Sequence, residues 1–166
     1  MSNVYSVKTV QKVPISLEQA WSFFSKPSNL KEITPDNLGF EIISKHHGSE
    51  MYAGQVIEYT VKPILGIPLY WMTEITHVVD NTYFIDEQRY GPYSMWHHQH
   101  HFKAIEGGVE MTDIVHYKLP FCFFGDIANF LFVRLQLKGI FDYRFHAVDK
   151  LFGAWPYGQP KIVEMG

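Results

Sequence analysis

The chain has 166 residues, a length typical of one domain, and 17 acidic against 14 basic residues leave a net charge of −3. Because no basic stripe is clustered along the chain, we expect no nucleic acid as a partner. No run of about 18 apolar residues occurs, so we expect no stable membrane insertion. The single cysteine, Cys122, excludes an intramolecular disulfide and favours a cytoplasmic location.

Aromatic residues are abundant, with 13 Phe, 10 Tyr and 4 Trp in a chain that is 46% hydrophobic. Aromatic rings build dense cores and also line apolar ligand pockets, so composition alone does not choose between the two. The chain contains no internal repeat and no linker that would divide it. We therefore expect a single domain over 1–166.

The N-terminal region predicts one strand followed by two short helices. A strand over 4–13 ends at Pro14, and Ser16 and Gln19 have the spacing of a capping box that opens a helix ending at Lys26. A second short helix over 28–33 ends before Thr34-Pro35, because a residue that precedes proline is disfavoured in the helical region.

The central region predicts six strands and the C-terminal region one long helix. Turn signals separate strand-like runs at about 39–46, 55–63, 69–79, 83–90, 93–105 and 109–119, and short connections imply antiparallel neighbours. Apolar residues then recur every three to four positions over 126–153, a helix of about 40 Å. The order predicts an α+β fold in which a curved antiparallel sheet of about seven strands wraps around the long C-terminal helix.

Four histidines lie within five positions of the predicted strand 93–105. Strand alternation places His98 and His100 on one face with Trp96 and Phe102, and it places His97 and His101 on the other, exposed face.

A two-residue turn at Gly107-Gly108 tests this assignment. It pairs Phe102 with Asp113, His100 with Val115 and His98 with Tyr117. The face of Trp96 and Phe102 then becomes the buried one.

Three polar residues therefore lie on the apolar face: His98, His100 and Asp113. They can satisfy one another in the core, line a wet cavity or contact a ligand. A metal site has less support, because His-x-His on a strand supplies two ligands and no spacing fixes a third, although Asp113 is a candidate. We expect neither a metal nor an organic cofactor.

Two arginines lie beside the apolar stripe of the long helix. Arg134 and Arg144 can extend their guanidinium groups to water, or point inward towards a carboxylate such as Asp86 or Asp113. Before the helix, the aromatic run at 121–124 either plugs the core or forms the lip of a cavity.

Several motifs carry a family resemblance that covers nearly the whole chain. They are W-x-T-x-I from Trp71, F-x-D-x-Q-x-x-G-P from Phe84, W-x-H-x-H-x-F from Trp96, D-x-V-x-Y-x-L-P from Asp113 and F-D-Y-R from Phe141. Together they look like a bacterial branch of the START-like ligand-binding superfamily, often abbreviated SRPBCC and related to polyketide cyclase/dehydrases. The resemblance implies a helix-grip fold, in agreement with the element order.

The superfamily includes lipid and hormone carriers, polyketide cyclases and quinone-binding proteins. The resemblance therefore implies an apolar small molecule held between sheet and long helix. The residues expected to bind it come from the motifs above and from strand alternation: Trp71, Thr73, Asp86, Gln88, Trp96, His98, His100, Asp113, Tyr117, Phe141 and Arg144.

Three functions remain open at this point. The first is a binding or carrier protein for a hydrophobic small molecule with a polar end. The second is a cyclase/dehydratase-type enzyme in which His98 or His100 acts as general base and Asp113 orients the ring. The third is a ligand-free protein-interaction module whose interior is filled by its own side chains.

Overall fold

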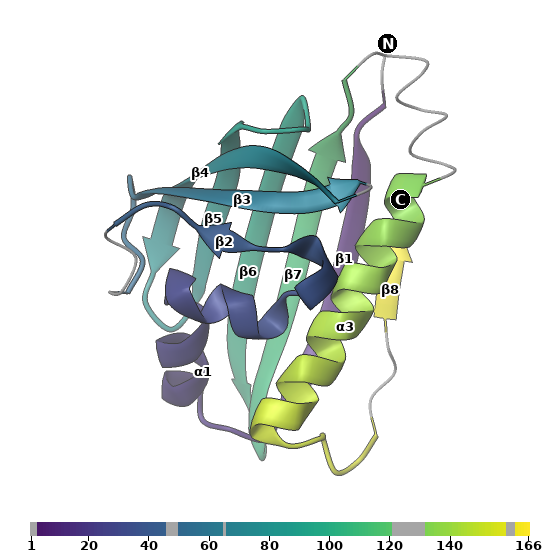
Figure 1. The fold of residues 1–166 in the computed structure, drawn as a ribbon. Helices are drawn as coiled ribbons and strands as arrows, with labels where there is room; N and C mark the ends of the chain where they lie inside the picture. Colours follow the sequence, from purple (N-terminus) through teal and green to yellow (C-terminus); the bar gives the residue numbers. More distant parts are fainter. Residues whose placement is uncertain (1–2, 46–49, 65, 121–131, 159–161) are drawn as a thin grey trace.

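The structure is a computed structural model that describes residues 3–45, 50–64, 66–120, 132–158 and 162–166 (Figure 1). The strands are β1 (Tyr5–Val13), β2 (Glu41–Ile42), β3 (Val56–Ile64), β4 (Ile67–Val79), β5 (Tyr83–Tyr90), β6 (Met95–Ile105), β7 (Gly108–Lys118) and β8 (Ile162–Met165). The helices are α1 (Leu17–Phe24), the 3-10 helices η1 (Pro27–Ile33) and η2 (Asp36–Leu38), and α3 (Arg134–Phe152). The aromatic run at 121–124 and the predicted helix start at 126–131 lie outside the described residues.

The strands form one antiparallel sheet in the order β2-β3-β4-β5-β6-β7-β1-β8. Figure 1 shows α1, η1 and α3 on the same face of this curved sheet, with α3 passing over β7 and β1. The architecture is the predicted helix-grip α+β fold. The predicted strand count is short by one, since β8 pairs with β1 at the edge of the sheet.

Local chemistry explains where the first helix begins. The Ser16 hydroxyl accepts from the Gln19 amide N–H at 3.2 Å, and the Ser16 amide donates to the Gln19 side-chain oxygen at 3.0 Å. This reciprocal pair satisfies two amide groups that no helical turn can satisfy, as the capping-box spacing predicted. The helix ends at Phe24, two residues before the predicted end, and Pro27 opens η1.

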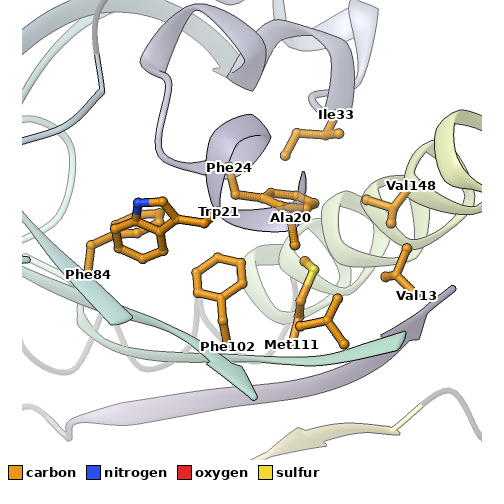
Figure 2. Close-up of a cluster of buried hydrophobic side chains, with 10 residues drawn as sticks. Val13, Ala20, Trp21, Phe24, Ile33, Phe84, Phe102, Met111 and Val148 are labelled. Atoms are coloured by element: carbon orange, nitrogen blue, oxygen red, sulfur yellow. The ribbon is translucent and has the colours of Figure 1, made fainter. Parts of the chain in front are cut away.

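One aromatic cluster closes the sheet against α1. Figure 2 shows Trp21 and Phe24 of α1 facing Phe84 and Phe102 of the strands, with Val148 of α3 beside them. The Trp21 ring meets Phe102 almost edge-on at a centroid distance of 5.6 Å, a geometry that aromatic quadrupoles favour. This cluster fixes one end of α3 on the sheet.

The predicted register of the hairpin between β6 and β7 is wrong by two residues. Its two-residue loop is Glu106-Gly107, and Ile105 pairs with Gly108. Gly107 has a φ of +80°, in the left-handed region, and the turn takes its glycine from this position. A side chain at Gly108 would be excluded for another reason: its Cβ would lie 2.1 Å from the carbonyl oxygen of Val13.

The observed partners are therefore shifted by two along β7. His100 lies opposite Asp113, His98 opposite Val115, and Phe102 opposite Met111. A shift of two residues returns every side chain to its original face, because strand alternation has a period of two. The prediction that His98 and His100 are buried is confirmed, at 8% and 7% exposure.

One smaller prediction about the strands also needs correction. Of the strand expected over 39–46, the described residues contain only Glu41–Ile42 as β2, paired with Thr60 and Tyr59.

In the part of the chain that the structure describes, no helix is long and apolar enough to cross a membrane.

Candidate functional site: a cavity between the sheet and α3

A cavity of about 690 Å³ lies between the concave face of the sheet, α3 and the short helices. This volume is within the range of small-molecule sites, about 300 to 1,000 Å³. Most of its wall is apolar, with rings from strands and from the segments that connect them, among them Phe40, Tyr59, Trp71, Tyr93 and Trp96. The described side chains therefore leave an open space where a ligand-free interaction module would be expected to have a filled interior.

One wall of the cavity is a set of aromatic rings organised around Thr73. The indole N–H of Trp71 donates to the Thr73 hydroxyl at 3.0 Å, and the Tyr59 hydroxyl lies 2.9 Å from the same oxygen. Trp71 meets Trp96 edge-on at 5.4 Å, and Tyr93 lies 4.9 Å from Trp96. These contacts satisfy the polar tips of Trp71 and Tyr59 and leave their ring surfaces for the cavity.

The polar part of the site is a cluster of four titratable side chains on three adjacent strands. Strand pairing puts Asp86 of β5 opposite His98 of β6, and Asp113 of β7 opposite His100 of β6. Nε2 of His100 lies 2.9 Å from Oδ2 of Asp86, and Nε2 of His98 lies 3.2 Å from Oδ1 of Asp113. The two histidines thus bridge two carboxylates.

The other ring nitrogen of each histidine faces the other aspartate. Nδ1 of His98 lies 3.6 Å from Oδ2 of Asp86, and Nδ1 of His100 lies 2.7 Å from Oδ1 of Asp113. The second contact is close but lies off the direction of the ring N–H bond, and Nδ1 of His100 is buried without a hydrogen bond among the described residues. Each imidazole therefore has one nitrogen towards Asp86 and the other towards Asp113.

The environment moves the pKa values of these four groups apart. Burial disfavours a charge on Asp113, but Arg144 and the two histidines outweigh it and hold the pKa of Asp113 well below its usual range. The same balance of burial against His100 and His98 lowers the pKa of Asp86.

The two histidines are affected in opposite directions. Burial and the neighbouring His100 lower the pKa of His98, whereas the close carboxylates of Asp113 and Asp86 overcome burial and raise the pKa of His100. The cluster therefore favours the charged form of His100 over the charged form of His98.

Arg144 points inward from α3 and closes the cluster. It is 9% exposed, its Nη2 lies 3.5 Å from Oδ1 of Asp113, and its guanidinium carbon lies 5.7 Å from the centre of the Phe24 ring. The predicted inward alternative, with Asp113 as the partner, is the one that the structure has. Arg134 instead donates to the Met165 carbonyl of β8 at 3.0 Å.

Eight of the eleven predicted binding residues line the cavity: Trp71, Thr73, Asp86, Trp96, His98, His100, Phe141 and Arg144. Three do not. Asp113 lies behind the histidines, and Tyr117 is 1% exposed in the core next to Tyr93. Gln88 binds the backbone of the turn before β6. The Gln88 amide donates to the Tyr93 carbonyl at 2.6 Å, and its oxygen accepts from the Tyr93 N–H at 3.2 Å.

The outer histidines of β6 belong to a separate polar ladder. His97 lies 3.0 Å from Glu87, Gln99 lies between the two imidazoles, and His101 lies 3.0 Å from the Gln99 oxygen. Both histidines are half-buried rather than exposed as predicted. The prediction that they face away from the core is confirmed.

Some cavity residues had not been predicted from the sequence, notably Tyr59, Tyr93 and Leu137. Leu137 lies four residues before Phe141 in the predicted helical stripe, and this spacing could have identified it. Tyr59 can be assigned to the cavity only from its strand pairing with Trp71. Tyr93 lies in a turn, where no side-chain periodicity indicates which way it points.

The register also creates a possible set of metal ligands. Among the described residues, one ligand atom each from Asp86, His98 and His100 lies within 4.8 Å of the other two. The sequence had pointed to Asp113 as the third group, whereas Asp86 is the carboxylate that shares the cavity wall with the histidines.

Comparisons with known proteins give structural neighbours but no family assignment. No family model matches the chain. No curated protein matches it either.

Solved structures with the same fold come from several sources. A protein from Mycobacterium smegmatis is 14% identical over 88% of this chain and 89% of its own, with a TM-score of 0.63. A protein from Thermus thermophilus is 13% identical over 87% and 94%, with a TM-score of 0.64. Ara h 8.0201 is 17% identical over 89% and 99%, with a TM-score of 0.55. At identities this low, the TM-scores show a common fold and nothing further.

Proposed function

We propose that this chain is a START-like, SRPBCC-type protein of a bacterial branch that binds or carries a hydrophobic small molecule in the cavity between the sheet and α3. The observation that carries the proposal is a largely apolar cavity of about 690 Å³ in whose wall four polar side chains, Asp86, His98, His100 and Arg144, are gathered at one place. Convergent polar groups in an apolar concavity orient a ligand by its polar end. A cytoplasmic location is part of the proposal, supported by the single cysteine.

Tryptophan fluorescence and melting temperature, followed together, test the proposal. Trp71 and Trp96 line the cavity, so a ligand that enters should change their emission and raise the melting temperature by mass action. The series should include fatty acids, the matching alcohols and alkanes, quinones, sterols and aromatic polyketides. At least one class should shift both signals.

Two variants localise the response. The double variant Trp71→Phe/Trp96→Phe should remove most of the fluorescence change, while Trp155→Phe, outside the cavity wall, should keep it. Ile140→Phe should weaken binding by filling part of the cavity from α3. If no class shifts either signal in the wild type, the binding function is wrong.

A cyclase/dehydratase-type enzyme is the second candidate, favoured by the pair formed by His98 and Asp113. His98 lines the cavity, its pKa is lowered by burial and by His100, and its Nε2 is held by Asp113 at 3.2 Å. A neutral, oriented imidazole is suited to remove a proton from an enolisable ketone. Turnover of such a ketone, lost in His98→Gln while ligand binding remains, would identify the enzyme; binding without turnover identifies the carrier.

A further inference from the structure

We propose that Asp86, His98 and His100 bind one divalent transition-metal ion at the wall of the cavity. The ligand atoms are Oδ2 of Asp86, Nδ1 of His98 and Nε2 of His100. This inference does not depend on the cavity holding an organic molecule, and it departs from the expectation of no metal because strand pairing supplies the third ligand that sequence spacing leaves open.

The distances between these atoms suit a common ion. Oδ2 of Asp86 lies 2.9 Å from Nε2 of His100 and 3.6 Å from Nδ1 of His98. Metal–nitrogen and metal–oxygen bonds of about 2.1 Å place neighbouring ligand atoms about 3.0 Å apart at right angles and about 3.4 Å apart at a tetrahedral angle. These two distances bracket the expected values, and ligand atoms of all three residues lie within 4.8 Å of one another. Side-chain rotations could therefore bring the three atoms around one ion.

The second nitrogen of each ring faces a carboxylate, as is usual for histidines that bind a metal. A histidine that binds a metal through one nitrogen usually donates the proton on its other nitrogen to a carboxylate, which fixes the ring and its tautomer. Asp113 occupies this position for His98, whose Nε2 lies 3.2 Å from Oδ1 of Asp113. The same oxygen lies 2.7 Å from Nδ1 of His100, off the direction of that ring's N–H bond, so a rotation of the His100 ring would be needed to form the second hydrogen bond. The buried Nδ1 of His100, which has no hydrogen bond among the described residues, would then carry the proton that faces Asp113.

The two aspartates of the cluster lie in different surroundings, Asp86 at the cavity wall and Asp113 behind it. Asp86, His98 and His100 line the cavity, whereas Asp113 lies outside its wall and contacts Arg144 at 3.5 Å. The positive charge of Arg144 is balanced by Asp113, so Asp86 is left as the anionic ligand for the ion.

The chemistry of the ligands selects the ion. Two imidazoles and one carboxylate suit zinc, iron, cobalt or nickel better than magnesium or calcium, which prefer oxygen ligands. Three protein ligands on one side leave coordination positions that face the cavity, as in metal sites that bind substrate or water. If the proposed ligand-binding function is correct, an oxygen at the polar end of the ligand would occupy one of them.

The test uses the full chain, stripped with a chelator and dialysed, with Co²⁺ and Zn²⁺ as probes. We expect one Co²⁺ per chain, with visible absorption bands of nitrogen and oxygen ligation, and competition by Zn²⁺. Asp86→Asn, His98→Gln and His100→Gln should each weaken binding at least tenfold. The matched control is His97→Gln/His101→Gln on the outer face of the same strand, which should bind as the wild type does.

The results decide between a metal site and a set of side chains that only satisfy one another. Failure of the wild type to bind either ion below millimolar concentration would overturn the proposal, as would equal binding by the three inner variants or loss of binding in the outer control. Circular dichroism checks that the variants fold. If an inner variant does not fold, the rise in wild-type melting temperature on adding Zn²⁺, absent at equal Mg²⁺, is the second measurement. Organic ligands are omitted, so a negative result leaves the carrier function to its own test.

Discussion

The imidazole rings of His98 and His100 lie on the same face of β6 with their centroids 3.7 Å apart. Two positively charged rings at this separation would repel strongly, so the pair accommodates one proton or one shared cation rather than two protons. Asp86 and Asp113 lie on the two neighbouring strands and supply the negative charge that such an occupant needs. The sheet therefore holds a compact charged cluster at the edge of an apolar cavity.

Phe102 should contribute strongly to stability, because it packs the sheet against α1. Its side chain is 5% exposed and meets Trp21, Phe24 and Phe84 at centroid distances of 5.6, 5.9 and 6.1 Å. We expect Phe102→Ala to reduce the free energy of unfolding by about 3 to 5 kcal/mol, because the truncation leaves a cavity that the rings cannot fill. Urea denaturation measures the loss.

Ile67, at 55% exposure, provides the control for Phe102. We expect Ile67→Ala to change the free energy of unfolding by less than about 0.5 kcal/mol. A loss of less than about 1 kcal/mol in Phe102→Ala would contradict the packing described for this cluster.

Gln88 should contribute to stability rather than to ligand recognition. Its side chain makes two hydrogen bonds with the backbone of Tyr93, and it lies outside the cavity wall. Gln88→Ala removes both partners, so we expect a loss of about 1 to 2 kcal/mol in the free energy of unfolding. Arg89→Ala is the control: its ion pairs with Glu74 and Glu87 are solvent-exposed and should be worth less than about 1 kcal/mol. A Gln88 variant of normal stability with an altered ligand preference would reverse this assignment.

Tyr93 and Tyr59 should make the protein less stable in alkali. Burial raises the pKa of both hydroxyls, with Tyr117 adding to the effect at Tyr93 and Asp86 at Tyr59. Above the ordinary tyrosine pKa of about 10, the unfolded chain ionises and the folded one does not. A raised folded pKa gives stability that is complete below this pH and is lost as the pH rises.

Each buried hydroxyl should therefore lower the free energy of unfolding by about 1.4 kcal/mol per pH unit above about pH 10. In Tyr93→Phe the slope should be smaller by one such contribution, while the stability at pH 7 stays within about 1 kcal/mol of the wild type. Urea denaturation between pH 9 and pH 11 gives both quantities. Identical slopes in the two proteins would mean that the Tyr93 hydroxyl ionises freely in the folded state.

The sequence predicted the fold because its signals are local. Alternation along strands, the helical period after 131 and the Ser16-Gln19 capping box each depend on neighbours within a few residues. The face of His98 and His100 was predicted for the same reason. It survived a register error because a shift of two residues preserves the face.

Long-range pairing was beyond the reach of the sequence patterns. Asp86 and His100, which form a hydrogen bond, are 14 residues apart in the sequence. Which carboxylate faces the cavity depends on the order of β5, β6 and β7 and on the position of the turn between β6 and β7, which is one residue earlier than expected. The direction of Arg144 was undetermined for a related reason, since a side chain beside an apolar stripe can turn either way until a buried partner is known. The strand β8 is only four residues long and its pairing with β1 closes the sheet edge from the far end of the chain.

Burial, rather than distance, should decide how strongly two ion pairs of α3 couple. Arg144 and Asp113 lie 3.5 Å apart with side chains 11% and 10% exposed, while Lys138 and Asp142 lie 2.6 Å apart with side chains 52% and 31% exposed. Charges in water are screened, whereas a buried charge that loses its partner keeps its full desolvation cost. We therefore expect the longer, buried pair to have the larger interaction energy.

A double-mutant cycle in the presence of a chelator measures this energy without a contribution from metal. Asp113→Asn should cost about 3 to 5 kcal/mol in the free energy of unfolding, since Arg144 then carries an unpaired charge beside Phe24. Arg144→Met, which keeps the packing volume, relieves that charge. The double variant should therefore be more stable than the sum of the two losses predicts, by about 1 to 3 kcal/mol. For Lys138→Met and Asp142→Asn the two effects should add to within about 0.5 kcal/mol. If the effects of the buried pair were also additive, Arg144 would be interacting with water in the cavity rather than with Asp113. Among the described residues, the cluster would then have no cationic side chain besides the two histidines.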